Sequence, residues 1–164
     1  MQRYGKRMQQ RSAAVLQFQV LARHAKLPDT IARDGSIAAH LAIELVRSGH
    51  GLDEHMDRLA YALNSAMLLA ELHVCAQHLG DIVRGQEALM ASHAQSHAAG
   101  VWLMHEPEYT AVCKALLCYD EQLKVATRVQ ILAADQELDR RSAAGLAVDD
   151  CPNIAPDDNV NYVK

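Results

Sequence analysis

Histidine is the residue type whose number and spacing could support chemistry in this chain, since nine histidines occur among 164 residues. His93 and His97 are four positions apart, which places both rings on one face of a helix, where two ligands of one metal ion can lie. A further ligand would come from another helix, on which Glu71 and His78 share one side at a spacing of seven residues. These four residues are the candidate metal ligands.

The sequence around these candidates does not form a known metal-binding pattern. It contains no HExxH motif and no Glu-x-x-His pair of the kind that di-iron helical bundles place on two helices. Ser92, Gln95 and Ser96 flank the His93–His97 pair, as is typical of exposed histidines. We therefore expect no bound metal and no cofactor, and a metal-binding helical-bundle enzyme that uses the clustered histidines is an alternative.

Glu71 is the acidic residue of this set, and it is flanked by Leu68, Leu69 and Leu72. A carboxylate held among leucines would lose hydration, which raises its pKa and is common at functional sites. The alternative places Glu71 on a narrow solvated stripe of the same helix, together with Asn64 and His78. The regular spacing of that stripe favours the solvated position.

The four cysteines show neither a CxxC pair nor a zinc-finger spacing: Cys75, Cys113, Cys118 and Cys151. Cys113 and Cys118 lie in an apolar stretch, where a thiol stays protonated and unreactive. The chain also has no GxSxG motif and no glycine-rich phosphate loop. We therefore expect no enzymatic activity, and the free thiols predict a reducing, cytoplasmic location.

Charge is distributed unevenly along the chain, whose formal net charge is −4. The first 28 residues contain basic side chains and no acidic one, and residues 1–11 form a basic arm with Arg3, Lys6, Arg7 and Arg11. Such an arm could neutralise phosphates, so these four residues are candidates for nucleic-acid binding. A solvated terminus is the favoured interpretation. Residues 145–164 are rich in aspartate and proline and predict a disordered, flexible acidic tail.

Composition predicts the fold class. Hydrophobic residues make up 50% of the chain but aromatic residues only 4%, with 8 glycines and 4 prolines, and the strongest helix formers dominate. These values exclude a β-sandwich, a disulfide scaffold and a disordered chain. The N-terminus lacks the apolar core of a signal peptide, and no apolar run is longer than that at residues 66–70, which is too short to span a bilayer. We expect an all-α protein that does not interact with membranes.

Glycine and proline divide the chain into about five helices, which we expect to form a single bundle over residues 12–144. The second begins at Ser36, or near Asp29 if Gly35 is tolerated inside it, and ends at Gly49. The third carries the most regular apolar seam and is expected at the centre of the bundle. The third helix is expected over residues 52–77. The first, fourth and fifth helices are expected over residues 8–26, 81–99 and 107–141, and Gly100 closes the fourth.

The predicted helix over 107–141 is longer than its neighbours, at about 52 Å against about 39 Å for the third helix. Near its end, apolar side chains lie on faces other than the seam of the earlier turns. These are Val125, Val129, Ile131 and Leu132. An N-terminal helix of the same chain or a second copy of the protein could cover them, and symmetric dimers are the commonest oligomers. We favour a homodimer. Trp102, between two helices, is expected to close the end of the bundle or to contact a partner.

These observations predict a small, non-enzymatic regulatory or adaptor protein that acts through contacts of its helical surfaces with itself and with an unidentified protein partner. The interaction candidates are Trp102, Val125, Val129, Ile131 and Leu132. The first alternative is a nucleic-acid-associated regulator that uses the basic arm, and the second is the metal-binding enzyme.

Overall fold

The computed structural model describes residues 22–145, and every regular element of more than one residue in this range is a helix, as the composition predicts. A single backbone pairing, between Lys26 and Thr127, is the extent of β-structure among these residues. The helices, in chain order, are α2 (Asp29–Arg47), α3 (Asp53–Glu71), the short 3-10 helix η1 (Ala76–His78), α4 (Leu79–Ala99), α5 (Glu106–Val125) and α6 (Arg128–Ala143).

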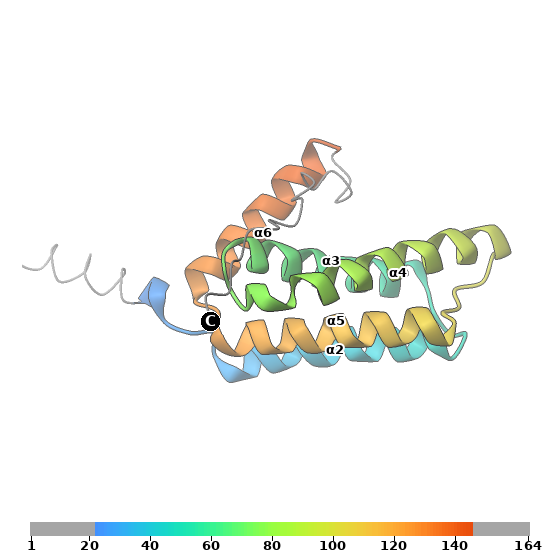
Figure 1. Ribbon diagram of the computed structural model, residues 1–164, viewed down its shortest axis with the longest axis horizontal. Helices are drawn as coiled ribbons and strands as arrows, with labels where there is room; N and C mark the ends of the chain where they lie inside the picture. The colour runs from blue at the N-terminus through green and yellow to red at the C-terminus, as the bar shows by residue number, and fades with distance from the viewer. Residues whose placement is uncertain (1–21, 146–164) are drawn as a thin grey trace, which may run out of the picture.

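Four of these helices, α2, α3, α4 and α5, lie side by side and form what we call the body (Figure 1). Successive helices run in opposite directions, and α5 returns to contact α2 as well as α4. α6 runs obliquely to the body and contacts α3. The largest side chains without solvent exposure lie between the four helices: Ile43, Leu59, Leu63, Leu69, Ile82 and Leu116.

Helix α3 is the centre of this arrangement, because it contacts α2, α4, α5 and α6. The apolar seam that predicts this position is buried, including Leu59, Leu63 and Leu69. The predicted end at residue 77 is wrong, since α3 stops at Glu71. His73 and Cys75 then adopt left-handed backbone conformations, with φ of 62° and 52°, and turn the chain toward α4.

Helix α2 begins at Asp29, so the alternative that places Gly35 inside a longer helix is confirmed. Its end is also as predicted, with Gly49 in a left-handed conformation at φ 75°. α4 begins at Leu79, two residues before the predicted start, and Gly100 closes it at φ 70°.

The predicted long helix over 107–141 is wrong, because the chain leaves the helical conformation at Ala126 and forms two helices, α5 and α6. Thr127 caps α6: its Oγ1 accepts a hydrogen bond from the Gln130 amide, and the Gln130 side chain accepts one from the Thr127 amide at 2.9 Å. The Arg128 amide donates a hydrogen bond to the Ala25 carbonyl at 2.9 Å, so the segment before α2 stabilises the turn between α5 and α6.

Several predictions concern residues outside the described range. The basic arm, with Arg3, Lys6, Arg7 and Arg11, lies there, as do most of the predicted helix over 8–26 and the acidic tail beyond Gly145. None of the helices within residues 22–145 combines the length and the apolarity needed to cross a membrane.

Candidate functional site

Four of the five predicted interaction residues lie on either side of the break between α5 and α6, at one end of the body. Val125, the last residue of α5, is 47% exposed, and Leu132 on α6 is 53% exposed. Val129 is half-buried, and Ile131 is half-buried and packs against the core. A continuous helix would have carried Val129, Ile131 and Leu132 away from the body along the axis of α5, whereas the capped turn at Thr127 redirects α6 so that it contacts α3.

Val129 and Leu132 line a groove of about 450 Å³ together with Ala133 and Gln136 of α6 and Ala22, Arg23 and Arg128. Alanine, valine and leucine side chains supply most of the groove wall, and Arg23 and Arg128 supply positive charge. Of the groove residues, sequence reasoning identified Val129 and Leu132, by their unmatched apolar faces, and did not name Arg128, Ala133 or Gln136. It missed Ala22 and Arg23, because only the pairing of Lys26 with Thr127 brings that distant segment to α6.

Polar contacts position α6 on α3. The Tyr61 hydroxyl donates to Asp135 Oδ1 at 2.8 Å, and Arg141 Nη2 lies 3.0 Å from Glu71 Oε2. Ala134 is the buried residue of α6. Glu71 is thus an exposed ion-pair partner of α6, on the solvated side of α3 that its spacing favours.

Trp102 is half-buried at the opposite end of the body and packs against the core. Its Cβ is so close to Gly51 that a Cβ built on that glycine would lie 2.8 Å away. The Trp102 ring centroid also lies 5.1 Å from that of His93. Trp102 therefore joins the α2–α3 and α4–α5 connections at this end, and its use by a partner stays a prediction.

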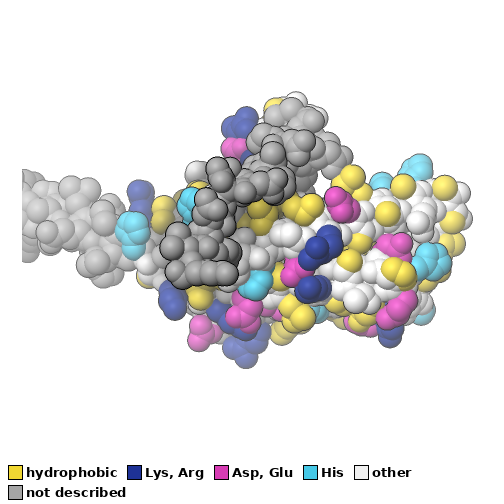
Figure 2. Space-filling view, viewed as in Figure 1, with side chains coloured by type: hydrophobic (Ala, Val, Ile, Leu, Met, Phe, Trp, Pro, Cys, Tyr) yellow, Lys and Arg dark blue, Asp and Glu magenta, His cyan; other side chains and the backbone are white. Residues whose placement is uncertain are grey.

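The structure does not bring the four candidate metal ligands together. The prediction that Glu71 and His78 share one side of a helix is wrong, because α3 ends at Glu71, which pairs with Arg141, and His78 lies on η1. His93 and His97 are exposed near the end of α4, with stacked rings whose centroids are 6.2 Å apart. His78 precedes the start of α4, about 22 Å away along the helix axis. Figure 2 shows histidine side chains near the end at which α4 stops. The His93–His97 pair and His78 cannot bind the same ion.

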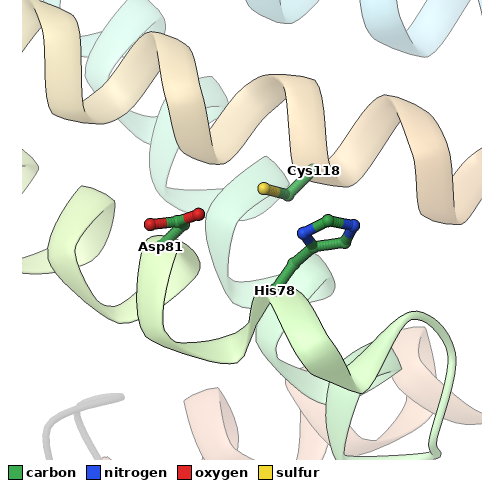
Figure 3. Close-up of side chains that lie close together, drawn as sticks. All are labelled: His78, Asp81 and Cys118. Carbon is green, nitrogen blue, oxygen red and sulfur yellow. The ribbon is translucent and has the colours of Figure 1, made fainter.

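His78 instead lies beside Asp81 of α4 and Cys118 of α5 (Figure 3). One ligand atom from each residue lies within 4.8 Å of the other two. Burial raises the pKa of the Cys118 thiol, while hydrogen bonds from Arg84 and Lys114 lower the pKa of the Asp81 carboxyl. Sequence reasoning missed Asp81 and Cys118, because the only local signal is the three-residue spacing from His78 to Asp81.

Comparison of the chain with protein-family models, with curated proteins and with solved structures finds no match in any of the three.

Proposed function

We propose that this chain is a small, non-enzymatic regulatory or adaptor protein of the cytoplasm, which acts through its helical surfaces and forms a homodimer. In this proposal a single helical bundle is flanked by the basic arm and the disordered acidic tail. The observation that carries the proposal is the apolar groove on α6, where Val129, Leu132 and Ala133 are available to another apolar surface.

The way in which α6 is attached supports this use of the groove. Tyr61 and Arg141 tie the helix to the body through polar contacts. Ile131, Ala134 and Leu138 pack against the core, while Leu132, on another side of the helix, is 53% exposed. An apolar helix face that stays exposed after the helix is attached to its own body is well suited to bind a second helix.

A second copy of the chain is the occupant that we propose. A two-fold axis beside Leu132 would bring the same residue of each copy together, so that one apolar patch provides both sides of the contact. Val125, at the neighbouring end of α5, would extend this patch. The competing occupant is the chain's own segment before Ala22, which contains Val15 and Phe18 and leads directly to the groove.

Light scattering coupled to size-exclusion chromatography of the full chain tests the proposal. We expect twice the chain mass of 18.0 kDa for the native protein and a shift to one chain mass for Leu132→Glu, with unchanged helical circular dichroism. Leu117→Glu is the matched control, because Leu117 is 58% exposed on α5 outside the groove. This variant should remain a dimer.

Two results would contradict the homodimer. One is a single-chain mass for the native protein over the whole concentration range. The other is a dimer that Leu117→Glu disrupts and Leu132→Glu does not. A monomer that Leu132→Glu destabilises would assign the groove to the segment before Ala22 instead.

A further inference from the structure

We propose that His78, Asp81 and Cys118 bind a divalent ion of the zinc class, at the point where the start of α4 meets α5. The proposal is independent of the surface on α6, which lies on other residues. His78 ends η1, Asp81 lies in the first turn of α4, and Cys118 lies on α5. Their side chains point toward one another in Figure 3.

The distances between the donor atoms suit a small ion. All three lie within 4.8 Å of one another. At metal–ligand distances of about 2.0 to 2.3 Å, neighbouring donors of a tetrahedral zinc site lie about 3.5 Å apart. The donor atoms are therefore at most slightly farther apart than in a zinc site, and we expect the side chains to adjust around an ion.

The backbone that carries His78 is held in an uncommon conformation. His73 and Cys75 have positive φ without being glycine. Gln122 fixes this turn from α5, since its side-chain amide donates to the carbonyls of Val74 at 3.0 Å and Ala66 at 2.9 Å. Gln122 is also one helical turn from Cys118, so the same face of α5 holds the loop and presents the thiol. Backbone strain of this kind is concentrated at functional sites.

The donor types also select the ion. A thiol, an imidazole and a carboxylate together suit zinc and cobalt better than magnesium or calcium, which prefer oxygen ligands. Cys118 is only 6% exposed, and an ion bound to its sulfur would replace the thiol proton. Three protein ligands leave a fourth tetrahedral position for water.

Two positively charged side chains contact Asp81, and their charge affects the affinity of Asp81 for a metal ion. Its Oδ1 accepts a hydrogen bond from Arg84 and lies 3.0 Å from Lys114 Nζ. Such contacts keep the carboxylate ionised and oriented, as outer hydrogen bonds do around metal ligands. Their positive charge opposes a divalent ion nearby. Removal of the Lys114 charge should therefore strengthen metal binding.

Titration of the full, untagged, reduced chain with cobalt(II) tests this site, because thiolate-to-cobalt charge transfer absorbs in the near ultraviolet and reports the sulfur ligand directly. We expect the band to saturate at one equivalent and to disappear when zinc is added. Cys118→Ser should abolish the band, while His78→Ala and Asp81→Asn should each weaken cobalt binding by at least about tenfold. Lys114→Met should strengthen it severalfold.

Cys113→Ser is the matched control, because Cys113 is a half-buried thiol of the same helix outside the cluster. This variant and the His93→Ala/His97→Ala double variant should bind cobalt as the native chain does. No charge-transfer band at stoichiometric cobalt, or a band that survives in Cys118→Ser, would overturn the proposal. Circular dichroism of each variant checks that the fold is retained. Lys114 is exposed and is not a proposed ligand, so Lys114→Met tests the site without changing a ligand.

Discussion

The side-chain amide of Gln122 donates a hydrogen bond to the carbonyl oxygen of Val74 at 3.0 Å, and both residues are buried. A second hydrogen bond, to the Ala66 carbonyl at 2.9 Å, fixes the same amide to the last turns of α3. A fully buried glutamine on α5 thus determines where the chain turns after α3.

Replacement of this amide should be costly. Gln122→Leu removes both hydrogen bonds and leaves the Val74 carbonyl buried without its partner, so we expect the free energy of unfolding to fall by about 2 kcal/mol. Urea denaturation measures the change. Gln86→Leu is the control, because Gln86 donates to Asn64 at 2.9 Å in a half-buried position, and it should cost less than about 1 kcal/mol. Equal losses in the two variants would contradict the anchoring role of Gln122.

Replacement of glycine by alanine should change the stability of the protein in opposite directions at two helical positions. A Cβ on Gly85 of α4 would lie 2.3 Å from the Ala115 Cβ of α5, so Gly85→Ala should force the helices apart and destabilise the protein by about 1 to 3 kcal/mol. Gly35 lies within α2 with nothing within 4 Å of its Cβ position. Gly35→Ala should stabilise the protein by about 0.5 to 1 kcal/mol. Thermal unfolding of both variants checks the signs, and a stabilised Gly85→Ala would exclude the close contact of α4 with α5.

The direction in which a substitution of Thr127 changes stability distinguishes two separate helices from one continuous helix. Thr127 caps α6, so Thr127→Ala should destabilise the protein by about 1 kcal/mol, and Thr127→Ser should retain most of the stability. In a continuous helix, alanine would instead stabilise that position, because its helix propensity is higher. Chemical denaturation of the two variants gives the answer directly.

Stability should decrease at alkaline pH through Tyr61. Burial and the hydrogen bond to Asp135 raise the pKa of Tyr61 from 10.0 to about 12. Between these values the folded chain retains a proton that the unfolded chain loses, so the stabilising contribution is complete below pH 10 and is lost as the pH rises toward 12. Absorbance titration of tyrosinate should show a late-titrating group that Tyr61→Phe removes.

Asp135→Asn supplies the control for this titration. It removes the negative charge that opposes ionisation of Tyr61, so the pKa of Tyr61 should move back toward its ordinary value. The pKa values of Tyr109 and Tyr119 are also raised, through the hydrogen bond to Glu44 and through burial respectively, and their late titration should persist in both variants. An unchanged titration in Tyr61→Phe would contradict the assignment.

The local sequence was sufficient to predict the helices and several of their ends. The apolar seam of α3 predicts a buried central helix, and Gly49 and Gly100 occupy left-handed positions after α2 and α4. The Thr127–Gln130 capping box is also a local signal, yet the apolar residues on both sides of it favoured one long helix. These features are readable because helix propensity, apolar spacing and capping depend on residues a few positions apart.

Only the tertiary structure decided where α3 ends and which side chains meet. Neither glycine nor proline marks the turn at His73 and Cys75, which Gln122 holds from another helix. Cys118 reaches His78 because α5 runs back along α4, and Ala22 reaches Leu132 because Lys26 pairs with Thr127. Each of these contacts joins residues far apart in the chain, so their energies depend on how the helices pack and not on the spacing of residues within one helix.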